Sequence, residues 1–265
     1  MHRNRVAIVV LNYLNYKDTI ECVDSVLNYD YKIEGIVVVD NGSENNSFEE
    51  LKAKYKNVDT VFVIKSKKNQ GFAKGNNLGI DFARKNLKAE FVLVVNNDTI
   101  FTDPEYIEKL LSRYKRGVGC LGSKIVLKNG LEQSEYTDYI SVKDTLGYLI
   151  NTFSSKCGSS FDFGTSNGAL VKMLHGSAIM FTPDFFEFYK GFYPRTFLYG
   201  EEAILYYMCQ LKSLEQVYVP ETSILHKEDQ SSIMSFSNDA SVINAYQYRS
   251  RKYVLLWALR SYFKR

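Results

Sequence analysis

The sequence predicts an α/β domain built on a Rossmann-like, doubly wound and mostly parallel sheet. Two observations lead to this fold class: strand-like and helix-like segments alternate through the first half of the chain, and the strand-like segments are apolar throughout. An uninterrupted apolar run is typical of a strand covered on both faces. The ligand site of such a sheet lies at the carboxyl ends of its strands. The expected strands are residues 6–11, 36–39, 60–64 and 91–95.

Helical signals fill the gaps between these strands. Apolar residues at helical spacing between residues 20 and 27 form one stripe and predict the first helix. Ser47 followed by Glu50 predicts a capping box that opens the second helix. Asp103 and Pro104 predict an N-cap followed by proline at the first position of a further helix. Strand and helix therefore alternate as a parallel sheet requires.

The second half of the chain carries weaker patterns. Residues 117–168 are rich in Ser, Lys, Tyr and Gly, and we expect loops there. Regular pattern returns over residues 170–181, and Thr182 with Pro183 predicts the start of a helix. A helix over residues 201–211 and a strand over 216–219 follow. The main domain should therefore extend over residues 1–230.

Residues 231–265 form a helical, basic C-terminal segment in this interpretation. Six Lys or Arg residues between positions 249 and 265 surround an apolar stretch at 253–259, and no acidic residue lies among them. This composition suits the surface of an anionic membrane. A helix packed on the domain through Leu255, Leu256 and Leu259 explains the pattern equally well. Both interpretations stay open.

Composition limits the class of partner and the compartment. The net charge is only +3, with 33 basic and 30 acidic residues, which argues against a nucleic-acid partner. Four cysteines lie far apart without a CxxC pair, so neither a zinc cage nor a disulfide framework is expected, and a cytoplasmic location fits best. No apolar run approaches the roughly 18 residues that a membrane span requires. We therefore expect a protein without a transmembrane anchor.

Polar residues follow three of the expected strands, at the edge where a ligand would bind. Such residues are ordinary turn formers, but an aspartate there can also accept hydrogen bonds from a ligand N–H, and Tyr13 offers an aromatic face for stacking. Asp98 could bind a divalent cation that is also bound to a diphosphate. Hard cations prefer oxygen ligands, and the phosphate can supply those that the protein does not. The three groups are Asn12-Tyr13, Asp40-Asn41-Gly42-Ser43 and Asn96-Asn97-Asp98.

Three further features have both a structural and a functional interpretation. Residues 70–79 carry a glycine at every fourth position, which fits close helix packing or close approach of a ligand, and they match neither the dinucleotide fingerprint nor the P-loop. Glu201 and Glu202 begin an expected helix, where acidic residues also complement the helix dipole. His226 follows the last expected strand and is either a structural residue or a ligand.

Taken together, these segments resemble glycosyltransferase family 2, especially its bacterial rhamnosyltransferase-like branch. The matching segments occur in the family's order and cover roughly residues 5–230. The resemblance implies a GT-A fold, with a nucleotide-sugar-binding half at residues 1–116 and an acceptor-side, catalytic half at 117–230. The segments are VAIVVLNY, IVVVDNGS, NQGFAKGNNLGI, FVLVVNNDT, HGSAIMF, FLYGEEAIL and VPETSILH.

The resemblance also implies an activity. It is the inverting, metal-dependent transfer of a sugar of the rhamnose, galactose or glucose type from a UDP- or dTDP-sugar to an acceptor hydroxyl. The acceptor would be a glycan or a lipid-linked saccharide in bacterial surface polysaccharide synthesis, with the enzyme at the inner face of the membrane. The ion would be Mn²⁺ or Mg²⁺, and a histidine ligand favours manganese.

Residue roles follow by similarity. Asp98 takes the position of the metal aspartate of the family's Asp-x-Asp motif, with His226 as second ligand. Glu202 stands where the family has its presumed catalytic base, and Glu201 is the alternative. Donor-binding residues are expected at Asn12, Tyr13, Asp40, Gly71, Asn76, Asn77 and Asn97, and acceptor-side residues at His175, Gly176 and Ser177.

The chain departs from the family pattern after this glutamate pair. Ile204 stands at a position that is often acidic, and Met208 at a position that is often arginine. These differences motivate one alternative, a non-catalytic relative that binds sugar nucleotides or glycans. A second alternative is a nucleotidyltransferase, although the Gly-rich basic loop typical of such enzymes does not follow the first strand.

Overall fold

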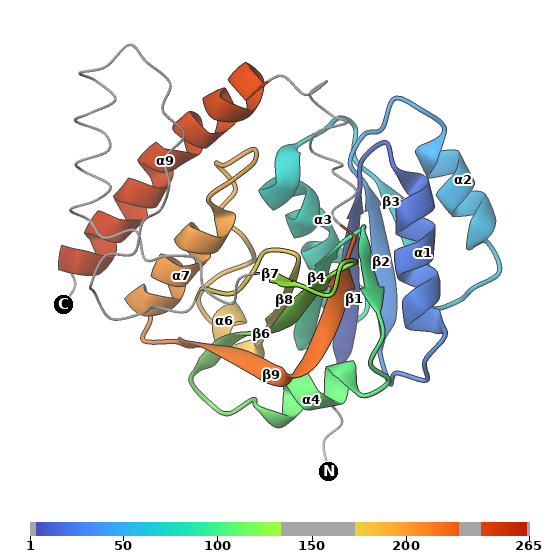
Figure 1. Cartoon of the computed structure of the whole chain (residues 1–265), viewed down its shortest axis with the longest axis horizontal. Helices are drawn as coiled ribbons and strands as arrows, with labels where there is room; N and C mark the ends of the chain where they lie inside the picture. The colour runs from blue at the N-terminus through green and yellow to red at the C-terminus, as the bar shows by residue number, and fades with distance from the viewer. Residues whose placement is uncertain (1–3, 134–172, 228–239, 264–265) are drawn as a thin grey trace.

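A computed structural model describes residues 4–133, 173–227 and 240–263 of the chain (Figure 1). Its strands belong to one sheet with the order β3-β2-β1-β4-β8-β6-β9-β5, and β7 pairs with β6. Strands β1 to β4 are parallel to one another. The strands are β1 Val6–Asn12, β2 Gly35–Asp40, β3 Val61–Lys65, β4 Phe91–Asn96, β5 Thr99–Phe101, β6 Val118–Leu127, β7 Glu132–Gln133, β8 Ala178–Phe181 and β9 Glu215–His226.

Helices cover both faces of this sheet. Alternate residues of β1 point to opposite sides, so Ile8 packs with α1 and α4 while Val9 packs with α3. The continuous apolar runs therefore arise from a doubly covered sheet, and the predicted fold class is confirmed. The helices are α1 Tyr16–Leu27, α2 Ser47–Lys54, α3 Gly71–Lys85, α4 Tyr106–Ser112, α6 Pro183–Phe186, α7 Glu201–Leu211 and α9 Ala240–Phe263.

The second half of the sheet is mixed rather than parallel. β8 is antiparallel to both β4 and β6, whereas β6 and β9 are parallel. Strand β9 is also longer than predicted, because it continues through Pro220 to His226 with a shift of register between Ser123 and Lys124 of its neighbour. His226 is thus the last residue of a strand, not part of a segment that follows one.

Two predicted helix starts are wrong in detail. Ser47 is the first residue of α2 and not its cap, and its hydroxyl has no hydrogen-bond partner among the described residues. At this end Ser47 N donates to Asn45 Oδ1 at 3.1 Å, and Asn46 Nδ2 donates to Glu50 Oε1 at 2.9 Å. Helix α4 begins at Tyr106, because the Asp103 carboxylate accepts from Glu105 N at 2.9 Å and forms a turn before the helix.

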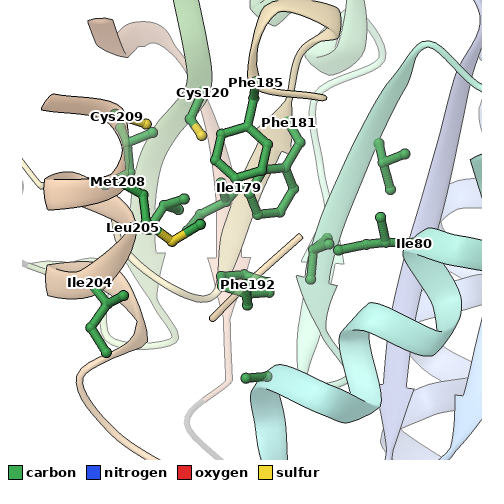
Figure 2. Close-up of a cluster of buried hydrophobic side chains, with 14 of the residues drawn as sticks. Ile80, Cys120, Ile179, Phe181, Phe185, Phe192, Ile204, Leu205, Met208 and Cys209 are labelled. Atoms are coloured by element: carbon green, nitrogen blue, oxygen red, sulfur yellow. The ribbon is translucent and has the colours of Figure 1, made fainter. Parts of the chain in front are cut away.

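The core on the α3 side of the sheet joins the two halves of the chain. Figure 2 shows Ile80 of α3 facing the aromatic rings of Phe181, Phe185 and Phe192, with Leu205 and Met208 of α7 on their other side. The rings of Phe181 and Phe192 meet edge to face, with centroids 5.0 Å apart. This packing fixes α7, and with it the glutamate pair, relative to α3 and the parallel strands that α3 covers.

Helix α9 lies along α7, at the opposite edge of the molecule from α1 and α2 (Figure 1). Its buried residues are Ser250, Val254, Trp257 and Ala258, and Ser250 Oγ donates to Leu198 O at 2.9 Å. The predicted packing face was wrong: Leu256 is exposed, and Leu255 and Leu259 are half-buried. Within the three described segments, no helix combines the length and the hydropathy that a membrane span needs.

Candidate active site

A buried network joins the carboxyl ends of β1 and β2. Asn12 Nδ2 donates to Asp40 Oδ2 at 2.8 Å, and Ser43 N donates to Asp40 Oδ1 at 3.0 Å. Asn12 and Asp40 have no exposed surface. Each oxygen of the Asp40 carboxylate is therefore hydrogen-bonded, as a buried carboxylate requires. Ser43 Oγ accepts from Leu14 N at 2.9 Å and so holds the β1–α1 loop, which carries Tyr13, against this network.

The same network continues to the end of β4. Thr19 Oγ1 donates to Asn12 Oδ1 at 2.9 Å, and Asn97 Nδ2 donates to Thr19 Oγ1 at 3.1 Å and to Asn15 O at 3.2 Å. Asn12 and Asn97 therefore bond to neighbouring protein groups, and their amides orient the loops around the site. Ser43 belongs to a polar group that the sequence analysis singled out, whereas Thr19 was missed, because a hydroxyl residue one turn into a helix carries no distinctive pattern.

Asp98 and His226 come together at the turn between β4 and β5. The pairing of β5 with β9 places His226 opposite Thr99. His226 Nε2 lies 3.3 Å from Asp98 Oδ1, and both side chains are about nine-tenths buried. His226 Nδ1 lies 2.8 Å from Gln133 Oε1. Since an amide oxygen only accepts, Nδ1 carries the hydrogen. Nε2 then either carries a second hydrogen, in an ion pair with Asp98, or presents a lone pair to a cation between the two side chains.

This arrangement fits a divalent cation. Two acceptor atoms that face each other inside a protein repel unless a proton or a metal lies between them. Two ligands of one small cation, each about 2.1 Å from it at roughly a right angle, lie about 3 Å apart, close to the observed separation. The described residues contain no group of three or more His, Cys, Asp or Glu side chains that could hold a metal. The remaining ligands would therefore come from a bound diphosphate and water.

Lys227 anchors the end of β9. Its backbone N donates to Asp98 O at 2.9 Å, and its ammonium group bonds to Asp18 and lies 2.9 Å from Glu21 Oε2. Burial opposes the charged form, but the hydrogen bonds to these two carboxylates raise the pKa of Lys227 above its usual value. The lysine thus fixes the distance between α1 and the strand that carries His226.

The segment 175–177, which the sequence predicts to face the acceptor, lies beside His226. Ser177 O accepts from Asn96 N at 2.9 Å, which holds the segment at the end of β4. Ser177 N donates to His175 Nδ1 at 3.2 Å, so in the neutral ring of His175 the hydrogen is on Nε2. The rings of His175 and His226 meet edge to face with centroids 5.9 Å apart.

Gly176 provides the space that the Glu202 carboxylate occupies. A Cβ atom at position 176 would lie less than 3.0 Å from Glu202 Oε1, 3.1 Å from its Cδ and 3.3 Å from its Cγ. These are the three nearest atoms to that position. Glu202 is half-buried, so its carboxylate lies at the segment 175–177 with a path to solvent.

Glu201 has a different environment although it is the adjacent residue. It is 5% exposed, and its Oε1 has no hydrogen-bond partner among the described residues. Burial and, to a smaller extent, the neighbouring charge of Glu202 raise the pKa of Glu201 to about 7, against the opposing effect of a hydrogen bond from Thr196. Successive helix positions point about 100° apart, so one glutamate enters the interior while the other faces the site.

The glycine-rich segment 70–79 is a packing device around α3. Gly71 has φ +78°, and a Cβ there would collide with the backbone of Phe197. Gly79 lies against Val9 and Val39 of the sheet. Asn77 exchanges two hydrogen bonds of 2.8 Å with the backbone of Phe192, so its amide does not face the donor side. Asn76 is fully buried and donates to Phe72 O at 3.1 Å.

These contacts form one continuous path along the strand ends. It runs from Asp40 through Asn12, Thr19 and Asn97 to Asp98 and His226, and ends where Gly176 meets Glu202. Most predicted residues thus gather at one edge of the sheet. Asn76 and Asn77 lie apart from this path, and Gln133 and Lys227 join it although no sequence signal pointed to them.

Known proteins resemble the chain both in sequence and in fold. The model of the family described as Glycosyl transferase family 2 matches residues 6–175. The glycosyltransferase GlyG of Streptococcus pneumoniae is 33% identical over 95 residues, which are 36% of this chain and 30% of that protein. The low-salt glycan biosynthesis hexosyltransferase Agl10 of Haloferax volcanii is 24% identical over 212 residues, which are 79% of this chain and 62% of that protein. The chain thus spans less than two thirds of either relative.

Solved structures share the fold. A mannosyltransferase of Pyrobaculum calidifontis, in complex with GDP-mannose and Mn²⁺, has a TM-score of 0.60 at 14% identity over 98% of this chain and 74% of its own. GalNAc-T7 with UDP, GalNAc and Mn²⁺ has a TM-score of 0.65 at 13% identity over 85% of this chain and 44% of its own. TarS of S. aureus has a TM-score of 0.58 at 16% identity, over 98% and 72%. With its GT-A fold and a family match over more than half of its length, the chain belongs to glycosyl transferase family 2.

Proposed function

We propose that the chain is an inverting, metal-dependent glycosyltransferase that moves a sugar from a UDP- or dTDP-sugar to an acceptor hydroxyl. The observation that carries the proposal is the buried pair of Asp98 Oδ1 and His226 Nε2, 3.3 Å apart at the carboxyl ends of the parallel strands. Two solved structures of the same fold are complexes with Mn²⁺ and a nucleotide or nucleotide sugar, which supports this reading of the pair.

Asp98 and His226 would hold the cation, which supplies a Lewis acid for the charge that develops on the departing diphosphate. Gln133 orients His226 so that Nε2 faces the ligand position. The network around Asp40 would form the nucleoside end of the site, with half-buried Tyr13 stacking on the base and the buried Asp40 carboxylate holding the surrounding loops in place. UDP and dTDP are the nucleotides proposed, on the family resemblance.

Glu202 is the proposed base. As the acceptor oxygen attacks the anomeric carbon, Glu202 takes the hydroxyl proton, and the bond from that carbon to the diphosphate oxygen breaks. The nucleoside diphosphate leaves with the bonding electrons. One direct displacement inverts the configuration, and no covalent enzyme intermediate is needed. Glu201, which burial biases toward its protonated form near neutral pH, would support the helix start rather than accept the proton.

The acceptor is proposed to be a glycan or a lipid-linked saccharide in surface polysaccharide synthesis. Gly176 lies against Glu202, and residues His175, Gly176 and Ser177 would therefore contact the acceptor. The resemblance to rhamnosyltransferase-like sequences and the glycan-biosynthesis role named for Agl10 support this class. The donor sugar is proposed to be of the rhamnose, galactose or glucose type. The enzyme is proposed to act at the cytoplasmic face of the membrane.

Calorimetric binding of UDP and dTDP, each with and without Mn²⁺, tests the donor site. We expect binding that depends on Mn²⁺ in the wild type and is lost in Asp98→Asn. Glu202→Gln should bind donor normally and lose transfer. If neither nucleotide binds under any condition, the donor-site assignment fails. If donor binds but neither transfer nor donor hydrolysis occurs, the chain is a non-catalytic relative.

A further inference from the structure

Helix α9 packs one face on the domain and leaves an apolar face exposed. Opposite the buried residues, exposed positions recur at a spacing of three or four: Tyr248, Lys252, Leu256, Arg260 and Phe263. A helix packed in this way usually turns polar residues outward. Here Phe263 and its neighbour Tyr262 are 80% and 64% exposed, the highest values among the large hydrophobic residues of the described chain.

The charge on this face has one sign. Residues 240–263 contain four basic residues and no acidic one. Lys252 Nζ lies 4.9 Å from the centroid of the Tyr253 ring, and Arg260 Cζ lies 5.4 Å from that of Trp257. The cations therefore sit beside aromatic rings rather than in ion pairs within the helix. Basic residues interleaved with exposed aromatic and aliphatic residues are typical of helices that lie in a membrane interface.

An open groove separates the end of α7 from α9. It has a volume of about 570 Å³ and is lined by Leu211 of α7 and by Leu256, Trp257, Leu259, Arg260 and Phe263 of α9. Five of these six side chains are apolar, and the sixth is a guanidinium group. The apolar side chains of this open groove can contact a hydrocarbon chain, and the single cation can pair with a phosphate at the end of that chain.

We propose that this face docks on an anionic lipid bilayer, with a lipid chain in the groove and Arg260 beside a lipid phosphate. The use of the docking, delivery of a lipid-linked acceptor, rests on the proposed transferase function.

Trp257 makes the proposal directly testable, because it is the single tryptophan of the chain and lines the groove. Vesicles of phosphatidylglycerol or phosphatidylcholine would be prepared with and without brominated acyl chains. We expect cosedimentation with phosphatidylglycerol vesicles and quenching of Trp257 by the brominated chains. Replacing Lys252 and Arg260 by Gln should weaken binding by roughly 30-fold, at about fivefold per cation.

Leu256→Ser with Phe263→Ser should reduce both binding and quenching. Leu131→Ser is the matched control, because Leu131 is 63% exposed but lies between β6 and β7. Absence of vesicle binding, or equal binding to both lipids without quenching, overturns the proposal. A third outcome also overturns it: the wild type is a dimer that does not bind vesicles, and the variant with Leu256→Ser and Phe263→Ser is a monomer. The exposed face would then be a contact between two copies of the chain. Nucleotide binding with Mn²⁺ is measured in parallel, so failure of the docking and failure of the transferase assignment are separate results.

Discussion

Replacing Gly176 by alanine should displace the carboxylate of Glu202, the proposed base, without disturbing the proposed donor site. The added Cβ would lie less than 3.0 Å from Glu202 Oε1, a separation that real Cβ atoms essentially never show. The three nearest atoms are all in one flexible side chain, so the glutamate can move while the backbone stays in place. The backbone of Gly176 does not have the left-handed φ that would strain an alanine.

The size of the effect follows from this geometry. The carboxylate must retreat by about 1 Å, and a displacement of that size can cost about 100-fold in rate. Loss of a general base altogether costs about 10²–10⁴-fold. We therefore expect Gly176→Ala to lower kcat about 100-fold while the affinity for nucleotide and Mn²⁺ remains unchanged.

A double-mutant cycle with Glu202→Ala isolates the cause. If the alanine acts through the carboxylate, Gly176→Ala should lower both activity and thermal stability in the wild-type background and neither in the Glu202→Ala background. Gly119→Ala, on β6, serves as the control: its Cβ would lie 3.0 to 3.3 Å from Leu214 and Cys209, a milder contact, and it does not touch the glutamate. Equal losses in the two backgrounds, or a weakened nucleotide affinity, would refute the reasoning.

Three other predictions follow from the structure. Gln133→Leu should weaken Mn²⁺-dependent nucleotide binding by about 10- to 100-fold in calorimetry, because His226 loses the group that fixes its ring. An unchanged affinity would contradict the assignment of His226 as a metal ligand. Burial raises the pKa of Glu201 to about 7 from an unfolded value of 4.5, so the native state binds the extra proton between these values and stability falls as pH rises through them. Glu201→Gln should abolish that fall, which amounts to about 2–3 kcal/mol in denaturant titrations at pH 5 and pH 8; an identical pH dependence in both proteins would contradict the assignment. Gly71→Ala should cost several kcal/mol of stability, because its Cβ meets the backbone of Phe197. Gly130→Ala has nearly the same φ but open space around the Cβ, so it should cost only about 1–2 kcal/mol. Similar melting temperatures of the two variants would show that the close approach does not matter.

The parts of the fold that sequence could predict are those that local pattern determines. The four continuous apolar runs gave the parallel strands and their covered faces, because a doubly buried strand has no polar side. The course of β9 through Pro220 could not be predicted, since it depends on a shift of register against β6 that only the folded sheet defines. The packing face of α9 was misjudged because apolar residues lie on both of its faces, so spacing alone does not say which face is buried.

The candidate site shows the same division. Polar residues at strand ends were expected to converge, and the edge of a parallel sheet brings Asp40, Asn97 and Asp98 together. What the sequence could not show is which amides bond to neighbouring protein groups. Asn77 bonds to the backbone of Phe192, 115 residues further along the chain, and Gln133 reaches His226 across 93 residues. Such partners are chosen by tertiary contact and leave no local signal.

The departures from the family pattern in α7 also have a structural reason. Ile204 is fully buried and Met208 is 3% exposed, and both belong to the core shared with Phe181 and Phe192. A charged group at either position would be buried among these side chains, so the hydrophobic residues suit the packing observed here. The loss of the family's acidic and basic residues therefore reflects the core of α7 and does not touch the carboxylate of Glu202.

The two adjacent glutamates then argue for a reaction rather than for binding alone. Burying Glu201 costs stability, and its Oε1 has no hydrogen bond from the described residues that offsets the cost. Glu202, at the next position, keeps access to solvent and lies in the space left by Gly176. Only Glu202 is therefore placed to take a proton from a bound hydroxyl, whereas Glu201 is held in the interior. A site that only bound a sugar nucleotide would not need such an accessible base, and the pH dependence of transfer compared with that of binding separates the two cases.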